Sequence, residues 1–271
     1  MLSSAHYPET YRLLEQEGYL FQSSLTSGLT SLRAAGTHDK GKFYSALFNL
    51  SIGIERLCKT IIIIDRMLKN KMLSPSESEM RQLGHQITVL HNAVVTIAAD
   101  RSVPFMVLGL QTPTTIALVD LLDEFALRSR YHNLDRLGSG RKSNDPLMEW
   151  HKILVEVLKT DCRPSLVQRL LGRVNHSVSQ IENNAIALAT GLDGTDLSLR
   201  EAFSEPALQD MALKHVVLRL IQFLSPFRVL LGSLCSEVYA IPGHPAIPQM
   251  QEFLEWVWDD RTYVLRKRVW P

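Results

Sequence analysis

Cysteine is scarce in this sequence, with only three among 271 residues. Cys58, Cys162 and Cys235 are far apart, form no CxxC pair and are odd in number, which argues against a disulfide framework or a zinc site. The nine histidines include no HExxH motif or other tight pair of ligands. We therefore expect three buried thiols, no bound metal and no cofactor.

A charge excess of either sign is lacking as well. The chain carries 29 lysines and arginines against 28 aspartates and glutamates, so its formal net charge is +1. This balance gives no global reason to expect a DNA-coating or a strongly acidic protein. Any such function must depend on local charge.

Long apolar runs and a leader segment are also missing. No stretch reaches the roughly 18 to 20 uncharged apolar residues that cross a membrane, and the most apolar one, residues 216–234, contains Arg219 and Arg228. The N-terminal residues show no basic start followed by an apolar block. We expect a soluble, cytoplasmic protein without a membrane partner.

The strongest positive signal is helical periodicity. Apolar residues recur three and four positions apart, and strand signals are nearly absent, which predicts an all-α protein. Residues 42–69 keep a seven-residue repeat and predict a long helix with one buried seam. The seam comprises Phe43, Leu47, Leu50, Ile54, Leu57, Ile61, Ile64 and Leu68. After a turn at 74–76, a helix over 80–97 is expected to form an antiparallel hairpin with it.

Four further helices are predicted, most of them near a proline, which suits the first helical turn. They cover residues 113–137, 146–159, 164–190 and 206–240. The last keeps a seven-residue seam across Pro226, comprising Leu213, Val217, Leu220, Leu224, Phe227, Leu231, Leu234 and Val238. The glycine- and serine-containing residues 138–146 predict a linker. We divide the chain there into a bundle of residues 1–140 and a second helical half, 141–271, packed on it.

Two glycine-containing loops resemble ligand-binding motifs but lack key features. Residues 36–42 have the GxxxxGK spacing of a phosphate-binding loop, yet Phe43 stands where Ser or Thr holds magnesium, and residues 23–35 are not a convincing strand. Residues 191–196 resemble a cation loop but lack the closing glutamate of an EF-hand. We expect an interhelical loop and a helix-capping turn.

A polar cluster follows the apolar stripe of the helix predicted over 113–137. Glu124, Arg128, His132 and Asp135 are spaced by four, four and three residues, so they share one edge of a continuous helix. Arg130 lies about 200 degrees around the helix from His132. The cluster can serve as a histidine acid or base beside a phosphate-binding arginine. The alternative, which the residues alone favour, is a salt-bridged helix end with a capped histidine.

A second basic group lies on the helix predicted after Pro164. Arg169, Arg173 and His176 share one face of that helix, opposite its apolar stripe. A solvated basic face is the default interpretation, and binding of an RNA backbone is the functional one.

The C-terminal residues combine aromatic and basic side chains. They are Trp256, Trp258, Tyr263, Arg266, Lys267, Arg268 and Trp270. Such residues can stack bases and neutralise phosphates, or they can hold the chain end on the bundle or on a second subunit, which we favour.

Three segments within residues 42–137 resemble HEPN-type domains. Residues 44–59 look like the first long helix of that family, with Glu55 as an acidic residue in an apolar series. Residues 81–85 resemble the basic-x-x-Gly-His turn that opens the next helix, and they end at His85. Residues 125–135 resemble a late helix of some bacterial members. The resemblance implies an all-α bundle that is frequently dimeric, and metal-independent ribonuclease activity in some members but not in others.

The chain departs from the family's catalytic motif, in which an arginine, then a polar residue, precedes a histidine. Arg128 and His132 are separated by three residues, fewer than in catalytic members. Arg169 and His176 are separated by six, but Leu170 stands where the polar residue belongs. For RNA cleavage, the resemblance implies a histidine base and an arginine phosphate contact.

The residues that we expect to carry such a reaction come from the first of these clusters. His132 is the expected base, Arg128 or Arg130 the phosphate contact, and Asp135 the residue that orients the histidine. The supporting candidates, Glu55 and His85, come from the resemblance alone.

Two functions from different classes follow. The first is a HEPN-like, RNA-directed protein of a bacterial defence, stress or toxin–antitoxin system, expected to be a homodimer through one of its long seams. The second is a noncatalytic helical module that binds a partner protein or a nucleotide. An exposed cleft at Arg128 and His132 favours chemistry, and a closed polar cluster favours a structural role.

Overall fold

The computed structural model describes residues 7–104, 112–138, 140, 143–242, 247–258 and 260–271. Within these residues the protein is helical, and its only β-type pairs are two isolated bridges, Gly36 with Asp39 and Thr190 with Asp196. The prediction of an all-α protein is therefore confirmed.

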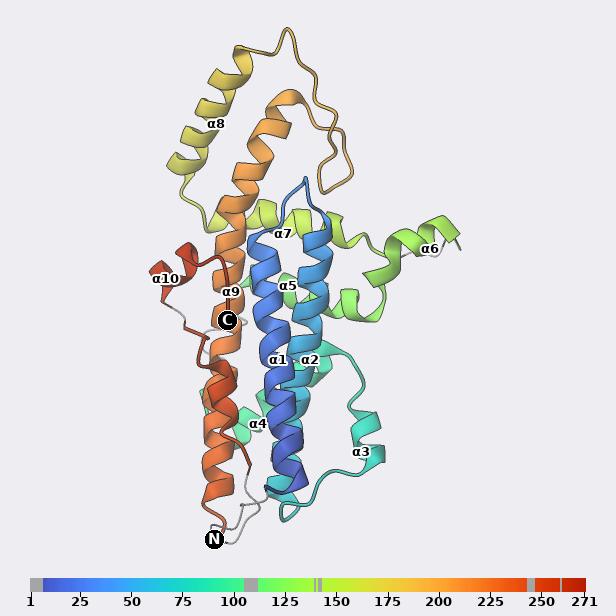
Figure 1. Ribbon diagram of the computed structural model, residues 1–271, viewed down its shortest axis with the longest axis vertical. Coiled ribbons are helices and arrows are strands. Elements are labelled where there is room, and N and C mark those ends of the chain that lie inside the picture. Colours follow the sequence, from blue (N-terminus) through green and yellow to red (C-terminus); the bar gives the residue numbers. More distant parts are fainter. Residues whose placement is uncertain (1–6, 105–111, 139, 141–142, 243–246, 259) are drawn as a thin grey trace, which may run out of the picture.

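Three long helices run side by side along the length of the molecule (Figure 1). They are α1 (Glu9–Arg33), α2 (Gly41–Lys69) and α9 (Leu199–Tyr239). No helix was predicted over residues 9–33, so α1 is an additional helix of the bundle. Its residues Phe21, Leu25, Leu29 and Leu32 are fully buried, and α1 packs on both α2 and α9.

Close packing of α1 on α2 depends on two glycines. A Cβ atom at Gly28 would lie 2.7 Å from Leu50 Cγ, and one at Gly53 would lie 2.7 Å from Leu25 Cγ. Each leucine therefore fills the space that the missing side chain leaves on the facing helix, and the two backbones approach closely.

Both predicted seams lie in the core. The α2 seam is buried from Phe43 to Ile64 and half-buried at Leu68, and every member of the α9 seam is buried. Both seams are already covered within one chain, so neither is exposed for the expected pairing of two copies, and the homodimer itself stays a prediction. The core is one contiguous cluster that contains residues from both sides of the predicted boundary at 140.

The helix predicted over 80–97 is in fact two helices, α3 (Glu77–Gln82) and α4 (Ile87–Asp100). The chain breaks between them where Gly84 adopts a φ of +61°, a conformation that glycine tolerates. The carboxylate of Asp123 fixes the new start, since it accepts hydrogen bonds from the Ile87 N–H at 2.6 Å and the Thr88 hydroxyl at 3.0 Å. α4 packs on α2, as expected.

The helix predicted over 113–137 also breaks. It consists of α5 (Pro113–Leu127), a 3₁₀ turn (Ser129–Tyr131) and α6 (His132–Gly138). The break is at Arg128, whose φ of −140° and ψ of −48° lie outside the helical range. α7 (Pro146–Thr160) follows. Both α5 and α7 cross the long helices, and α6 extends away from the bundle (Figure 1).

The later helices differ from prediction at their ends. α8 (Pro164–Ser179) stops well before residue 190. α9 begins before Pro206, because Ser198 and Glu201 form a capping box. Pro206 and Pro226 both lie within α9, as was expected for Pro226 alone. A 3₁₀ segment (η2, Met250–Leu254) and α10 (Arg261–Arg266) complete the described chain.

By length and composition α9 is able to cross a membrane, with a mean hydropathy of 1.4 in its most apolar window. The rest of the protein buries 61% of that window, as is common in the core helix of a globular protein.

Candidate functional site

The polar cluster around His132 is closed. The imidazole is buried, its Nδ1 lies 2.9 Å from the Ser143 hydroxyl, and its Nε2 lies 3.9 Å from an Asp145 carboxylate oxygen. Ser143 and Asp145 thus face the two ring nitrogens. They take the positions at the ring that were expected for Asp135. The arrangement holds the start of α6 against the segment that leads into α7.

The arginines expected to act with His132 do not converge on it. Because the helix breaks at Arg128, the predicted common edge of the four polar residues does not form. Arg128 is exposed, with its Nε 4.0 Å from Glu124, and the Arg130 guanidinium donates a hydrogen bond of 2.7 Å to the Ala126 carbonyl. No described cleft joins these cations to the histidine. The geometry therefore fits the alternative of a polar helix end in which the histidine has a structural role.

The other candidates taken from the HEPN resemblance lie elsewhere on the surface. His85 Nδ1 lies 2.8 Å from Glu55 Oε1, and the same carboxylate pairs with Lys59 at 2.8 Å. The His85–Glu55 contact links the connection before α4 to α2. The His85 side chain is 74% exposed and lies in no described cleft.

The basic face of α8 is exposed, as the default interpretation predicts. Only Leu170 and Val178 of this helix are buried. Arg169, Arg173 and His176 are exposed, and no ion pair with a described residue holds them. The face is available to an anionic partner.

The two ligand-like loops are structural. α1 rather than a strand precedes residues 36–42, and Lys42, the lysine of that motif, pairs with Asp39 at 3.3 Å. In the second loop, Asp193 accepts hydrogen bonds from the backbone N–H and the hydroxyl of Thr195. Among the described residues, no group of three or more His, Cys, Asp or Glu side chains is placed to hold a metal ion.

The C-terminal residues hold the chain end on the bundle. Trp270 is buried, and its backbone N–H donates to the Thr30 hydroxyl at 3.0 Å. The buried Arg33 donates to the Lys267 carbonyl at 3.3 Å and pairs with Asp210 at 3.3 Å. Burial lowers the pKa of the Arg33 guanidinium, and the nearby Asp210 carboxylate partly offsets this effect. The favoured interpretation, that the C-terminal residues hold the chain end in place, is confirmed for Trp270.

The three cysteine side chains are free and buried, as expected. Burial raises the pKa of each thiol above its ordinary value. They are poor nucleophiles and are therefore not candidates for chemistry.

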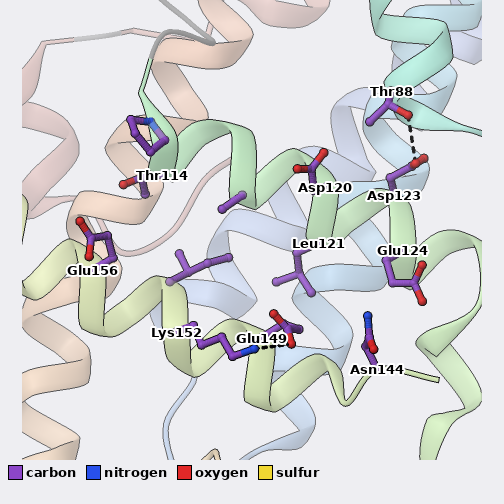
Figure 2. Close-up of a pocket in the computed structure, with 13 residues that line it drawn as sticks. Thr88, Thr114, Asp120, Leu121, Asp123, Glu124, Asn144, Glu149, Lys152 and Glu156 are labelled. Atoms are coloured by element: carbon purple, nitrogen blue, oxygen red, sulfur yellow. Dashed lines mark hydrogen bonds and ion pairs between the residues drawn. The ribbon is translucent and has the colours of Figure 1, made fainter. Parts of the chain in front are cut away.

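A cleft of about 690 Å³ between α5 and α7 is the most distinctive site of the described chain (Figure 2). Five carboxylates line it: Asp120, Asp123, Glu124, Glu149 and Glu156. The one lysine of the described lining, Lys152, pairs with Glu149 at 2.8 Å. Pro113, Ala117, Leu121 and Ile153 add apolar surface. The cleft therefore combines negative charge with apolar contacts.

Helix geometry explains how the carboxylates come to line the cleft. Asp120, Asp123 and Glu124 are three and four residues apart on α5, and Glu149 and Glu156 are seven apart on α7, so each set shares a helix face. Glu124 and Asn144 lie at one end of the cleft, and Thr114 and Glu156 lie at the other (Figure 2).

Two of the carboxylates are free to bind a ligand. The side chains of Asp120 and Glu156 are exposed and form no ion pair with a described residue. Asp123 is already engaged, since it caps α4. This site was not among the predictions from the sequence, although the spacing of the acidic residues on α5 and α7 was a usable signal.

Comparison of the chain with models of protein families, with curated protein sequences and with solved structures finds no match.

Proposed function

We propose that this protein is a noncatalytic helical interaction module, and that the cleft between α5 and α7 binds a basic, partly apolar segment of a protein chain. The observation that carries the proposal is the lining of the cleft, five carboxylates with one lysine above apolar side chains. Complementary charge sets the specificity and the association rate of such sites, and apolar burial supplies affinity.

The same charge argues against a polyanion in the cleft. Nucleic acid binds through lysines and arginines that neutralise its phosphates. Among the described residues of the lining, Lys152 is the only basic one, and Glu149 already neutralises it. A basic peptide is the complementary ligand.

The test is binding of a labelled amphipathic Lys/Leu peptide, measured by fluorescence anisotropy. The variant Asp120→Lys, Glu156→Lys reverses two exposed charges that form no described ion pair, so the fold is retained. We expect it to weaken binding about tenfold, since two charge pairs contribute up to about 2 kcal/mol together. Glu9→Lys, Glu252→Lys reverses two exposed charges on α1 and in η2 that likewise form no described ion pair, and it is the matched control. Equal affinity for all three proteins contradicts the proposal.

RNA binding at α8 is a second candidate, favoured by the exposed and unpaired Arg169, Arg173 and His176. Binding of single-stranded RNA, followed over a series of salt concentrations, tests it. Replacing the two arginines with alanine should reduce the salt dependence, by a slope of about 0.7 for each lost phosphate contact. An unchanged slope excludes this face.

A HEPN-like ribonuclease stays a prediction, as do its bacterial defence context and cytoplasmic location. The closed environment of His132 supports the noncatalytic alternative. Metal-free incubation of labelled RNA with the protein, beside His132→Ala and His176→Ala, distinguishes the two. We expect no cleavage by any of the three proteins, and cleavage that one substitution abolishes would establish a ribonuclease.

A further inference from the structure

Residues 127–138, which we call the arm, expose an unusual amount of apolar surface. The arm comprises the end of α5, the 3₁₀ turn and α6, and it extends away from the bundle (Figure 1). Leu134 is 66% exposed and Leu137 is 86% exposed, and Leu127 and Tyr131 are also exposed. Four large apolar side chains are therefore exposed within twelve residues, and such concentrations of exposed apolar surface mark interaction sites.

The arm is also basic. Arg128, Arg130 and Arg136 are exposed along it, while Asp135 is its only acidic residue. The arm thus carries the two properties that the cleft between α5 and α7 requires of a ligand, positive charge and apolar side chains. The charges of the arm and the cleft are complementary.

The base of the arm is fixed in place. The buried His132 contacts Ser143 at 2.9 Å, and the Asn133 amide donates to the Tyr44 hydroxyl at 3.2 Å. These contacts direct α6 away from the bundle, so the arm is presented to a second molecule. A segment that is ordered before binding loses little conformational entropy when it docks.

We infer that the arm of one copy of this chain docks in the cleft between α5 and α7 of a second copy. The inference rests on the proposed function, because it names the segment that the cleft binds. Leu134 and Leu137 would lie on the apolar residues of the cleft, and the arm's arginines would face its carboxylates. Each copy has one arm and one cleft, so a twofold axis allows a reciprocal exchange that closes as a dimer.

Sedimentation velocity over about 1 to 100 µM protein tests the inference. We expect the wild-type chain to form a dimer. The arm variant Leu134→Asp, Leu137→Asp changes two exposed side chains and should raise the dimer dissociation constant at least about tenfold. The cleft variant Asp120→Lys, Glu156→Lys should do the same. Leu188→Asp, which changes a leucine that is 92% exposed outside the arm, is the matched control and should leave the dimer intact.

Mixing the two defective proteins gives a sharper test. The cleft variant has an intact arm and the arm variant an intact cleft, so a mixture restores one of the two contacts. At protein concentrations at which each variant alone is monomeric, we expect the mixture to form a mixed dimer. This dimer should be weaker than the wild-type dimer. A mixture that stays monomeric overturns the reciprocal exchange.

Two other results overturn the inference. One is a wild-type chain that remains monomeric at 100 µM, and the other is a dimer that neither pair of substitutions weakens. The Lys/Leu peptide separates this failure from failure of the proposed function. Peptide binding that depends on Asp120 and Glu156 in a monomeric protein leaves the cleft as a docking site for a different chain.

Discussion

Two buried histidines should make the protein sensitive to mild acid. His91 of α4 stacks on Phe223 of α9 with ring centroids 5.3 Å apart, and His215 of α9 is buried with its Nδ1 unpaired. Burial lowers the pKa of His91 from its ordinary 6.5 to about 4. Burial, with the nearby Arg261 and Lys214, lowers the pKa of His215 to about 4 as well.

The sign of the effect follows from proton binding. Between pH 6.5 and pH 4 the unfolded chain binds protons at these histidines and the folded chain does not, so stability falls as the pH falls through this window. The two pKa values give a loss of about 2 kcal/mol per histidine between pH 7 and pH 5. Together, protonation linked to His91 and His215 should lower the free energy of unfolding by about 4 kcal/mol between pH 7 and pH 5.

Urea unfolding at pH 7 and pH 5 measures this loss. We expect the variant His91→Leu, His215→Leu to lose about 4 kcal/mol less than the wild-type chain over the same interval, whatever its stability at pH 7. His176→Gln, at an exposed site on α8, is the control. Equal losses in the wild-type and double-variant proteins would refute the reasoning, as would an NMR titration of the folded protein that places the His91 pKa near 6.5.

Two further predictions concern local structure. Gly53→Ala places a Cβ atom 2.7 Å from Leu25 Cγ and should destabilise the protein by about 1 to 3 kcal/mol. Gly172→Ala, on α8 with no atom within 4 Å of the new Cβ, should instead stabilise it by about 0.5 to 1 kcal/mol. Thermal unfolding of both variants checks that the two effects have opposite signs. Asp123→Ala removes the carboxylate that caps α4 at Ile87 and should cost about 0.5 to 2 kcal/mol in urea unfolding, and a variant as stable as the wild type would show that this cap contributes nothing.

The sequence predicts the long helices well because their burial repeats over many turns. The seams of α2 and α9 lie in the core where the seven-residue repeat places them. Helix boundaries were harder to predict from the sequence, because they depend on single residues. Gly84 ends a turn through its positive φ, and the capping box at Ser198 starts α9 ahead of Pro206.

The candidate site was less predictable than the fold. The spacing of Arg128, His132 and Asp135 indicates a shared edge only if one helix continues through them, and the chain breaks at Arg128. The cleft combines α5 and α7 with Thr88 at the start of α4, so its residues meet only through tertiary packing. The charge of each helix face was visible in the sequence, but the hollow between the helices was not.

The reciprocal packing of glycines and leucines between α1 and α2 has a consequence for the alignment of the two helices. Leu25 and Gly28 on α1, and Leu50 and Gly53 on α2, have the same three-residue spacing, and each leucine meets the other helix's glycine. If α1 slid along α2 by one turn, both leucines would leave their glycines together and would meet residues that carry a Cβ atom. The pair therefore acts as a register lock, which opposes sliding of the helical hairpin in either direction.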